Sequence, residues 1–355
     1  MKIFTRTLLF IALMSTSGIP GKSQEVNEYI YRPFQLTLIT PLSTNGFDSK
    51  DCVNKISLNL LWGVNAGLQG IEYGGIANIE TDFVEGFQYA GFGNFNRGAL
   101  YGVSGAGFMN TASEVKGLQS AGFMNITKQL TGAQFAGFMN ISDFVRGAQI
   151  SDFMNIAEEV HGVQAAGFMN IAENVKGTQI GFINIADNYE AGVPIGFINI
   201  VKNGYHDFEI AGSEIWNLNF GYRLGVDRLY TQFMMGSRWD PHDKFWGFGV
   251  GLGTRFDITG YFKGSLDLTS YQLVEHRHLY AQHPNLLEQL RLTFEGKIFG
   301  DLKWFIGPSF NLLITPFEYT EPAFLEHFDP WTVYENTGGG SYLKMWPGIS
   351  GGIRF

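Results

Sequence analysis

The sequence has little charge, a single cysteine and no long hydrophobic run beyond its first residues. Charged residues make up 16% of its 355 residues, against roughly 25% in an average soluble domain. The one cysteine, Cys52, excludes an intrachain disulfide. No later segment reaches the roughly 18 continuous apolar residues of a membrane-spanning helix. If the chain enters a membrane, it must therefore do so with β-strands.

Basic runs are also missing, and the net charge is −9. Binding to nucleic acid depends largely on neutralising phosphates, so this balance argues against a nucleic-acid partner. The chain nevertheless contains 32 Phe and 46 Gly, and 45% of its residues are hydrophobic. A composition rich in aromatics and poor in charge excludes a disordered chain.

Residues 1–24 have the pattern of an export signal. Lys2 and Arg6 form a short basic start, Leu8 to Met14 an apolar stretch, and Ser15 to Ser23 a tail of small residues. The apolar stretch is far shorter than the roughly 20 residues of a membrane anchor. We therefore expect the leader to be cleaved and the mature chain to lie outside the cytoplasm.

A repeat of about fifteen residues fills the first half of the chain. The pattern is Gly-x-Gln-x-Ala-Gly-Phe-x-Asn-Ile, with clear copies at Gly117–Ile126 and Gly132–Ile141. Glycine in the interior of every copy, and the absence of a helical period, indicate β structure. Nine copies cover residues 70–200, anchored by Asn78, Asn94, Asn110, Asn125, Asn140, Asn155, Asn170, Asn184 and Asn199.

Two β architectures fit this period. In a meander, each copy is one membrane-crossing strand of a large barrel; in a solenoid, each copy is one coil, and identical side chains stack from coil to coil. In seven copies the Gln position precedes the Phe position by four residues, as with Gln164 and Phe168. In the last two the gap is three, as with Gln179 and Phe182. A one-residue deletion reverses the faces of a continuous strand but can be absorbed at a corner. The spacing therefore favours the solenoid, with a corner at Gly167 and its equivalents.

A solenoid predicts columns of identical residues. We expect the Phe and Ile positions to stack as the apolar filling and the amides to form hydrogen-bonded ladders. The Asn and Gln columns could form either a ligand-binding face or internal structural ladders, and we favour the second interpretation. The predicted columns are Phe123, Phe138, Phe153 and Phe168; Asn125, Asn140, Asn155 and Asn170; and Gln119, Gln134, Gln149 and Gln164.

The second half of the chain has the alternation of a small antiparallel barrel. Strands are predicted at 215–225, 229–238, 245–256, 261–273, 290–298, 302–314 and 347–355. Ile56 to Val64, before the repeats, supplies an eighth strand, and Phe34 to Thr40 is left over. The predicted organisation is a leader (1–24), N-terminal strands (25–67), a β-solenoid repeat domain (68–201) and a transmembrane β-barrel (202–355), with one larger meander barrel as the alternative.

Connection lengths in the second half indicate a membrane. They alternate between tight segments, such as 257–261 and 299–302, and long ones, such as 274–288 and 315–345. Outer-membrane barrels have short periplasmic turns and long external loops. If the final strand ends in the periplasm, the long loops face outward, and so does the repeat block inserted before residue 214. We therefore expect an outer-membrane location with the repeats at the cell surface.

Three parts of the sequence resemble a known family: the repeat string, the closing copies Gly177–Ile185 and Gly192–Ile200, and the junction from Val201 to His206. They resemble the surface-repeat outer-membrane proteins described in leptospires and common in Bacteroidetes. The resemblance covers residues 34–240, and it implies a cell-envelope location without a known activity or catalytic residues. Three departures, Asp152 for Gly, Ser104 for Gln and Pro194 for Gln, weaken individual columns.

Few residues suggest chemistry. His276, His278 and His283 lie in one predicted external loop and are weak candidates for metal ligands. Ser270 and Ser309 are available as nucleophiles, but no spacing pairs either with a base. The Gly-x-Ser-x-Gly string Gly348–Gly352 ends three residues before the C-terminus, so the helix that this motif requires cannot follow.

These observations predict a non-enzymatic outer-membrane surface protein that holds no cofactor. Its barrel would anchor a repeat domain for ligand or surface interaction or for envelope structure. The expected partners are outer-membrane lipid, the barrel-insertion machinery and an extracellular ligand of unknown type. A pore in which the repeats are barrel strands is the alternative function.

Overall fold

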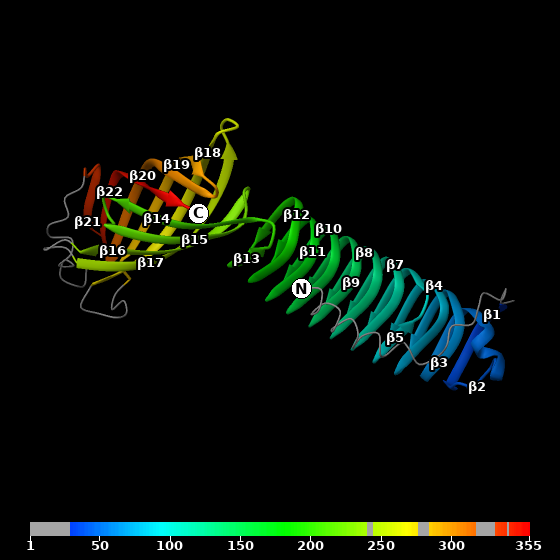
Figure 1. Cartoon of the computed structure of the whole chain (residues 1–355). Coiled ribbons are helices and arrows are strands. Elements are labelled where there is room, and N and C mark those ends of the chain that lie inside the picture. The colour runs from blue at the N-terminus through cyan, green and yellow to red at the C-terminus, as the bar shows by residue number, and fades with distance from the viewer. Residues whose placement is uncertain (1–28, 240–243, 276–283, 317–330, 339–340) are drawn as a thin grey trace. The chain divides into compact units, whose positions relative to one another are not determined.

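A computed structural model describes residues 29–239, 244–275, 284–316, 331–338 and 341–355 (Figure 1). The predicted leader lies outside these residues. The chain divides after Ala186 into two compact units, each of which is described by itself. Both are built of β-strands, and the fold is a nine-turn β-solenoid of stacked parallel strands followed by a closed antiparallel barrel of eight strands. The predicted combination of solenoid and barrel is confirmed, and the meander is excluded.

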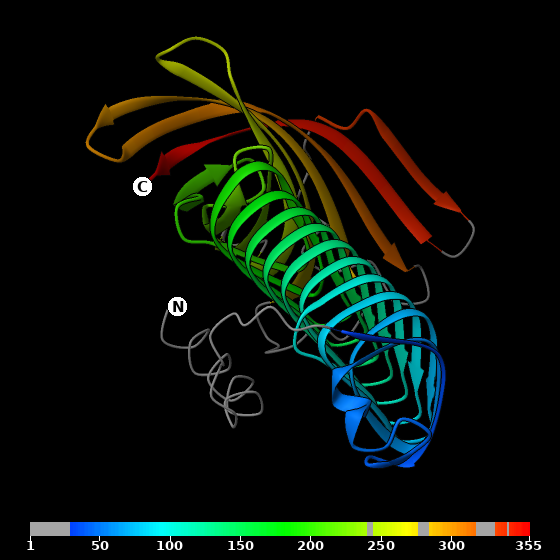
Figure 2. The same ribbon diagram turned by 90° about the vertical axis from the view of Figure 1, so that its right-hand side faces the viewer.

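The solenoid sheet is parallel and in register from coil to coil. Asn125 pairs with Asn140, and Asn140 in turn with Asn155, so each coil lies directly on the last (Figure 2). Its elements are β1 (Ile30–Ile39), β2 (Leu42–Ser43), the short 3-10 helix η1 (Gly46–Asp51), β3 (Cys52–Gly74), β4 (Ala77–Ala90), β5 (Gly93–Asn96), β6 (Ala99–Ala106), β7 (Met109–Ala121), β8 (Met124–Ala136), β9 (Met139–Ser151), β10 (Met154–Ala166), β11 (Met169–Ile180), β12 (Ile183–Ile195) and β13 (Ile198–Val201).

The shortened copies are absorbed at the corner that the sequence predicts. β11 ends at Ile180 and β12 begins at Ile183, so the missing residue falls at the turn between the strands. Gln179 still pairs with Gln164, and the amide of Asn170 still reaches Asn184 at 2.9 Å. The ladders therefore continue across a step of fourteen residues.

A second corner lies at the first glycine of each copy. Gly132 has φ +135°, and a Cβ atom added there would overlap the carbonyl oxygen of Gly117 in the coil below. Only glycine adopts this backbone conformation without strain.

We expect Gly132→Ala to destabilise the solenoid by about 1–3 kcal/mol, because it adds both backbone strain and a steric overlap. Thermal unfolding of the full-length protein followed by circular dichroism measures the loss. Thr131→Ala, at the exposed neighbouring position, is the matched control. Equal stability of the two variants would show that the corner at position 132 does not require glycine.

The interior of the coils is filled by aliphatic side chains and amides. One column of Val and Leu residues is fully buried, as in Val115, Leu130, Val145 and Val160, and the Asn and Gln columns are buried beside it. The prediction that the Phe column is the filling is wrong: Phe153 and Phe168 are each 38% exposed. The Asn amides occupy the space inside the corner at Gly167 and its equivalents, next to the Phe column. There, for example, Asn125 donates across the coil to the carbonyl oxygen of Phe135. The Ile column is mixed, with Ile156 2% and Ile200 43% exposed.

The barrel closes through antiparallel pairing of its first and last strands, with Ile210 opposite Ile353. Its strands are β14 (Tyr205–Ser213), β15 (Leu218–Val226), β16 (Leu229–Trp239), β17 (Lys244–Asp257), β18 (Phe262–Glu275), β19 (Leu286–Phe299), β20 (Leu302–Pro316) and β22 (Ser341–Arg354), and β21 (Tyr334–Gly338) pairs with the start of β22.

One predicted barrel strand belongs elsewhere. Ile56 to Val64 lies in β3, which pairs in parallel with β1 and β4 of the solenoid sheet. The leftover segment Phe34 to Thr40 is largely β1, so the predicted N-terminal strands belong to the solenoid sheet. The true eighth strand is β14, at residues that the sequence left as a junction. This correction moves the point at which the chain enters the barrel to Tyr205.

Candidate functional site

The outer face of the barrel is apolar, and much of its interior is polar. On β18, Leu266 and Leu268 are 41% and 54% exposed, whereas Asp267 and Thr269 between and beside them are fully buried. Large apolar side chains are exposed on the neighbouring strands as well, including Phe248, Leu252, Leu290, Phe294, Ile306 and Ile349. Strands with this alternation suit a barrel that faces lipid.

A network of buried ion pairs fills the middle of the barrel. Glu209 on β14 contacts the guanidinium groups of Arg223 at 2.7 Å, Arg291 at 2.8 Å and Arg354 at 2.9 Å. All four side chains are at most 1% exposed. Asp267 on β18 binds Arg223 at 2.8 Å. β14 and β18 are four strands apart in either direction around the barrel, so the network joins opposite walls.

A buried apolar cluster, rich in aromatic side chains, also lies inside the barrel. Trp216, Phe245, Tyr271, Leu287 and Trp346 belong to one cluster whose members are at most 3% exposed. Barrels of eight strands have an interior just wide enough for side chains to fill. The ion pairs and the aromatic cluster accordingly occupy the interior of the described barrel.

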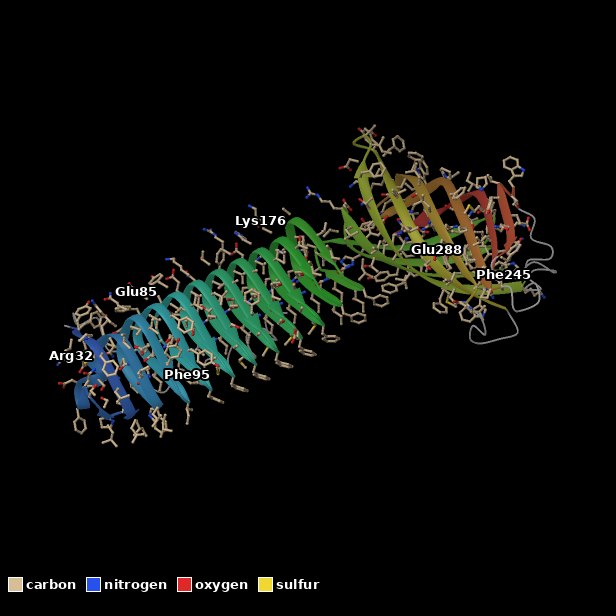
Figure 3. All side chains as sticks on the ribbon, turned by 180° about the vertical axis from the view of Figure 1, so that it is seen from behind. Arg32, Glu85, Phe95, Lys176, Phe245 and Glu288 are labelled. Atoms are coloured by element: carbon tan, nitrogen blue, oxygen red, sulfur yellow. The ribbon has the colours of Figure 1, made fainter. Side chains whose placement is uncertain are left out.

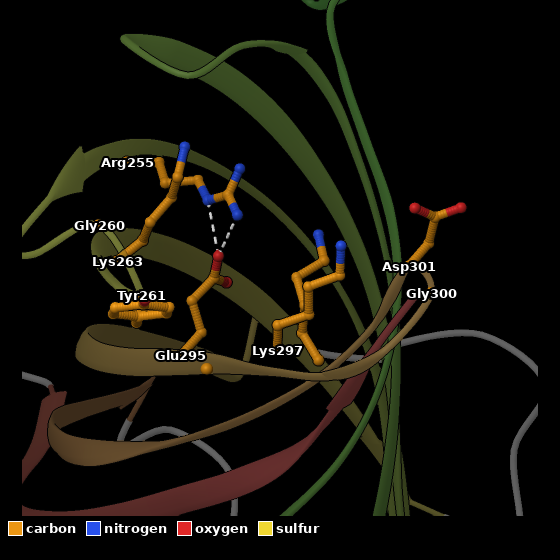
Figure 4. A pocket seen from close by; sticks show the side chains of 10 residues that line it. Arg255, Gly260, Tyr261, Lys263, Glu295, Lys297, Gly300 and Asp301 are labelled. Atoms are coloured by element: carbon orange, nitrogen blue, oxygen red, sulfur yellow. Dashed lines mark hydrogen bonds and ion pairs between the residues drawn. The ribbon is translucent and has the colours of Figure 1, made fainter.

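The short turns β15–β16, β17–β18 and β19–β20 lie at one end of the barrel, which we call the short-turn end. A pocket of about 250 Å³ lies there, lined by Arg255, Tyr261, Lys263, Glu295 and Lys297 among others (Figure 4). Arg255 binds Glu295 closely and Asp227 at 3.2 Å. Lys263 is 3.4 Å from Asp227. Most charge in the pocket is thus neutralised within the protein.

The solenoid exposes an aromatic ridge, which we call the Phe column. Successive rings are nearly parallel: the centroids of Phe108 and Phe123 are 4.7 Å apart, and those of Phe123 and Phe138 are 4.9 Å apart. Another edge of the solenoid carries charge, including Glu85 and Lys176 (Figure 3). The column consists of Phe92, Phe108, Phe123, Phe138, Phe153, Phe168 and Phe182.

The amide columns are internal ladders. Asn125 donates to Asn140 at 2.9 Å, Asn140 to Asn155 at 2.9 Å, and Asn155 to Asn170 at 3.0 Å. The Gln column runs in the opposite direction, from Gln164 to Gln149, Gln134 and Gln119. All eight side chains are fully buried. A ligand-binding face made of these columns is therefore excluded.

The residues considered for chemistry are not brought together. Ser270 donates to Glu288 at 2.6 Å, and Ser309 lies 3.5 Å from Glu214. Gly348–Gly352 lies within strand β22 and not at a turn. His276, His278 and His283 lie outside the described residues. Across the described ranges, no cluster of three or more His, Cys, Asp or Glu side chains could hold a metal ion.

Sequence reasoning missed two carboxyl groups inside the first coils. Glu72 on β3 and Glu80 on β4 are both fully buried, and the amide of Asn65 donates to Glu72 at 3.0 Å and to Glu80 at 2.9 Å. Burial, followed by repulsion from Glu72, holds the pKa of Glu80 well above its usual range. The protonated carboxyl of Glu80 can donate a hydrogen bond to the neighbouring carboxylate of Glu72. The sequence carries one signal of this buried pair, because position 72 has Glu where most copies of the repeat have Gln.

The raised pKa of Glu80 predicts that stability falls as the pH rises above the ordinary range of a carboxyl group. A pKa raised by folding gives stability that is present below the unfolded-state pKa and lost as pH rises toward the folded-state pKa. The slope between these values is at most about 1.4 kcal/mol per pH unit. We expect Glu80→Gln to weaken this pH dependence, as measured by hydrogen exchange of β3 and β4 at pH 4 and pH 9. Glu85→Gln, at an exposed position, should behave like the unmodified chain; identical pH profiles for both variants would refute the assignment.

No helix among the described residues is long and apolar enough to cross a membrane. Comparison of the chain with protein-family models, with curated proteins and with solved structures gives no match.

Proposed function

We propose that this chain is a non-enzymatic outer-membrane protein whose barrel anchors the repeat domain. The single observation that supports this most strongly is the apolar outer face of the barrel. Outward residues such as Leu268 and Ile349, 54% and 58% exposed, would contact lipid. The ion pairs around Glu209 would neutralise the charged groups that are buried in the lumen. Outer-membrane lipid and the barrel-insertion machinery are the partners that such a barrel requires.

The repeat domain supplies the second part of the function, which is contact with a ligand or a neighbouring surface, or a structural role in the envelope. Its exposed Phe column supports a contact role, since contiguous apolar surface on a protein commonly marks an interaction site. The partners of Ser270 and Ser309 are carboxylates and not imidazoles, which supports a role without nucleophilic catalysis.

Passive transport is the second candidate function. The filled lumen argues against it, because the ion pairs of Arg223, Arg291 and Arg354 with Glu209 lie across the only axis that a solute could follow in the described barrel. We expect the purified protein to give no steady conductance in planar bilayers. Stable single-channel steps would favour the pore instead.

Membrane fractionation tests the proposal. The full chain should co-fractionate with the outer membrane and should migrate differently on gels before and after heating, as folded barrels do. Leu268→Arg places a charge on the lipid-facing surface and should cost about 2–4 kcal/mol near the bilayer midplane, reducing the folded, membrane-bound fraction. Lys176→Glu, on the charged edge of the repeat domain, is the control. Recovery of the unmodified protein in the soluble fraction would reject the proposal.

A further inference from the structure

The direction of β14 determines the end of the barrel at which the repeat domain is attached. Tyr205, where β14 begins, pairs with Gly225 of β15. Gly225 adjoins the turn in which Val226 pairs with Leu229. The chain therefore enters the barrel at the short-turn end, and the preceding coil lies there too, with Asn199 donating to Thr231 of β16 at 2.9 Å.

The C-terminus lies at this end as well. Arg354, the last residue of β22, pairs with Lys303 near the start of β20, and Phe355 exchanges backbone hydrogen bonds with Phe208. An even number of strands requires this arrangement, since the first strand must begin where the last strand ends. The longer connections, which join β18 to β19 and β20 to β21, leave the opposite end.

Outer-membrane barrels place short turns in the periplasm and long loops outside. We propose that the repeat domain of this chain lies in the periplasm and not outside the cell. This placement reverses the one expected from the sequence, because that expectation took 215–225 as the first strand after the repeats. The inference rests on the proposed function, since it requires the barrel to lie in the outer membrane.

The route of export supports the same placement. The leader delivers the chain to the periplasm, and the repeat domain precedes the barrel in sequence. To reach the cell surface, the domain would have to cross the outer membrane, but the lumen is filled by Glu209, Arg223 and Arg291 and by the aromatic cluster around Trp216. A periplasmic repeat domain requires no second crossing.

Single-cysteine labelling of intact cells tests the placement. In a Cys52→Ala background of the full chain, three exposed positions are compared: Lys176→Cys in the repeat domain, Asp301→Cys at the short-turn end, and Trp331→Cys, 87% exposed, at the opposite end. A membrane-impermeant maleimide should label position 331 in intact cells. It should label positions 176 and 301 only after the outer membrane is permeabilised.

Labelling of position 176 in intact cells would overturn the inference, and so would labelling of position 331 only after permeabilisation. Fractionation of the same cells separates this failure from failure of the proposed function. A chain that is found in the outer membrane but is labelled from outside at position 176 loses only its periplasmic placement. A chain that is absent from the outer membrane loses the proposed function itself.

Discussion

Replacing Glu209 with Gln should destabilise the barrel by about 3–5 kcal/mol, the usual cost of removing one partner from a buried ion-pair network. Glu209 is the shared acceptor of Arg223, Arg291 and Arg354, each within 2.9 Å. The amide keeps the shape of the side chain but removes the charge, so three buried guanidinium groups lose their common counter-ion. Urea unfolding of the protein in detergent, followed by tryptophan fluorescence, measures the loss.

Glu288→Gln is the matched control for this experiment. Glu288 lies on β19 of the same barrel, but it is only partly buried and its hydrogen-bond partner is Ser270. We expect this variant to unfold within about 1 kcal/mol of the unmodified protein, as partly exposed polar contacts contribute little. If Glu209→Gln were equally mild, the network would not be what holds the barrel walls together.

The second large effect is expected in the repeat domain, where Asn140→Leu breaks the Asn ladder at its middle. Asn140 accepts from Asn125 at 2.9 Å and donates to Asn155 at 2.9 Å and to the carbonyl oxygen of Ile150 at 2.8 Å. Leucine has a similar size but leaves these groups unsatisfied in a dry interior, at about 1–3 kcal/mol each. Thermal unfolding of the full chain and hydrogen exchange of β8, β9 and β10 measure the result.

Phe138→Ser provides the comparison, because Phe138 lies two residues before Asn140, belongs to the aromatic column and is only partly buried. It removes stacking with Phe123 and Phe153, whose centroids are 4.9 Å and 4.8 Å distant, but leaves no buried polar group unpaired. We expect it to destabilise the solenoid less than Asn140→Leu. The opposite ranking would mean that the external aromatic column, and not the internal amide ladder, stabilises the coils.

The repeat spacing predicted the solenoid because a lost residue has different consequences in a strand and at a corner. The closer spacing of Gln179 and Phe182, relative to Gln164 and Phe168, favoured a turn between them over a bulge in a strand, and the structure places a turn there. The amide ladders followed from the same period. Alternation of apolar and polar residues likewise located most of the barrel strands.

The sequence did not reveal which side of a corner faces inward. The Phe column lies outside because the Asn amides form hydrogen bonds across the coil and fill the corner. The alternation of apolar and polar residues does not predict which side chains face inward at a turn. The strand β14 was missed because it follows the last repeat closely, and Ile56 to Val64 offered a clearer alternation. That one error reversed the expected side of the repeat domain. The pairing of Glu72 with Glu80 depends on register between coils, which spacing alone leaves open.

Contact between the outer face of the barrel and lipid is the central claim, and site-directed spin labelling tests it most directly. Nitroxides are attached at Leu268→Cys and Thr269→Cys, which are 54% and 0% exposed in the unmodified chain, in a Cys52→Ala background reconstituted into vesicles. At position 268, collisions with oxygen should be frequent and collisions with a water-soluble nickel chelate rare. Position 269, in the lumen, should be shielded from both. Free access of the nickel chelate to position 268 would show that this face lies in water and would contradict the account.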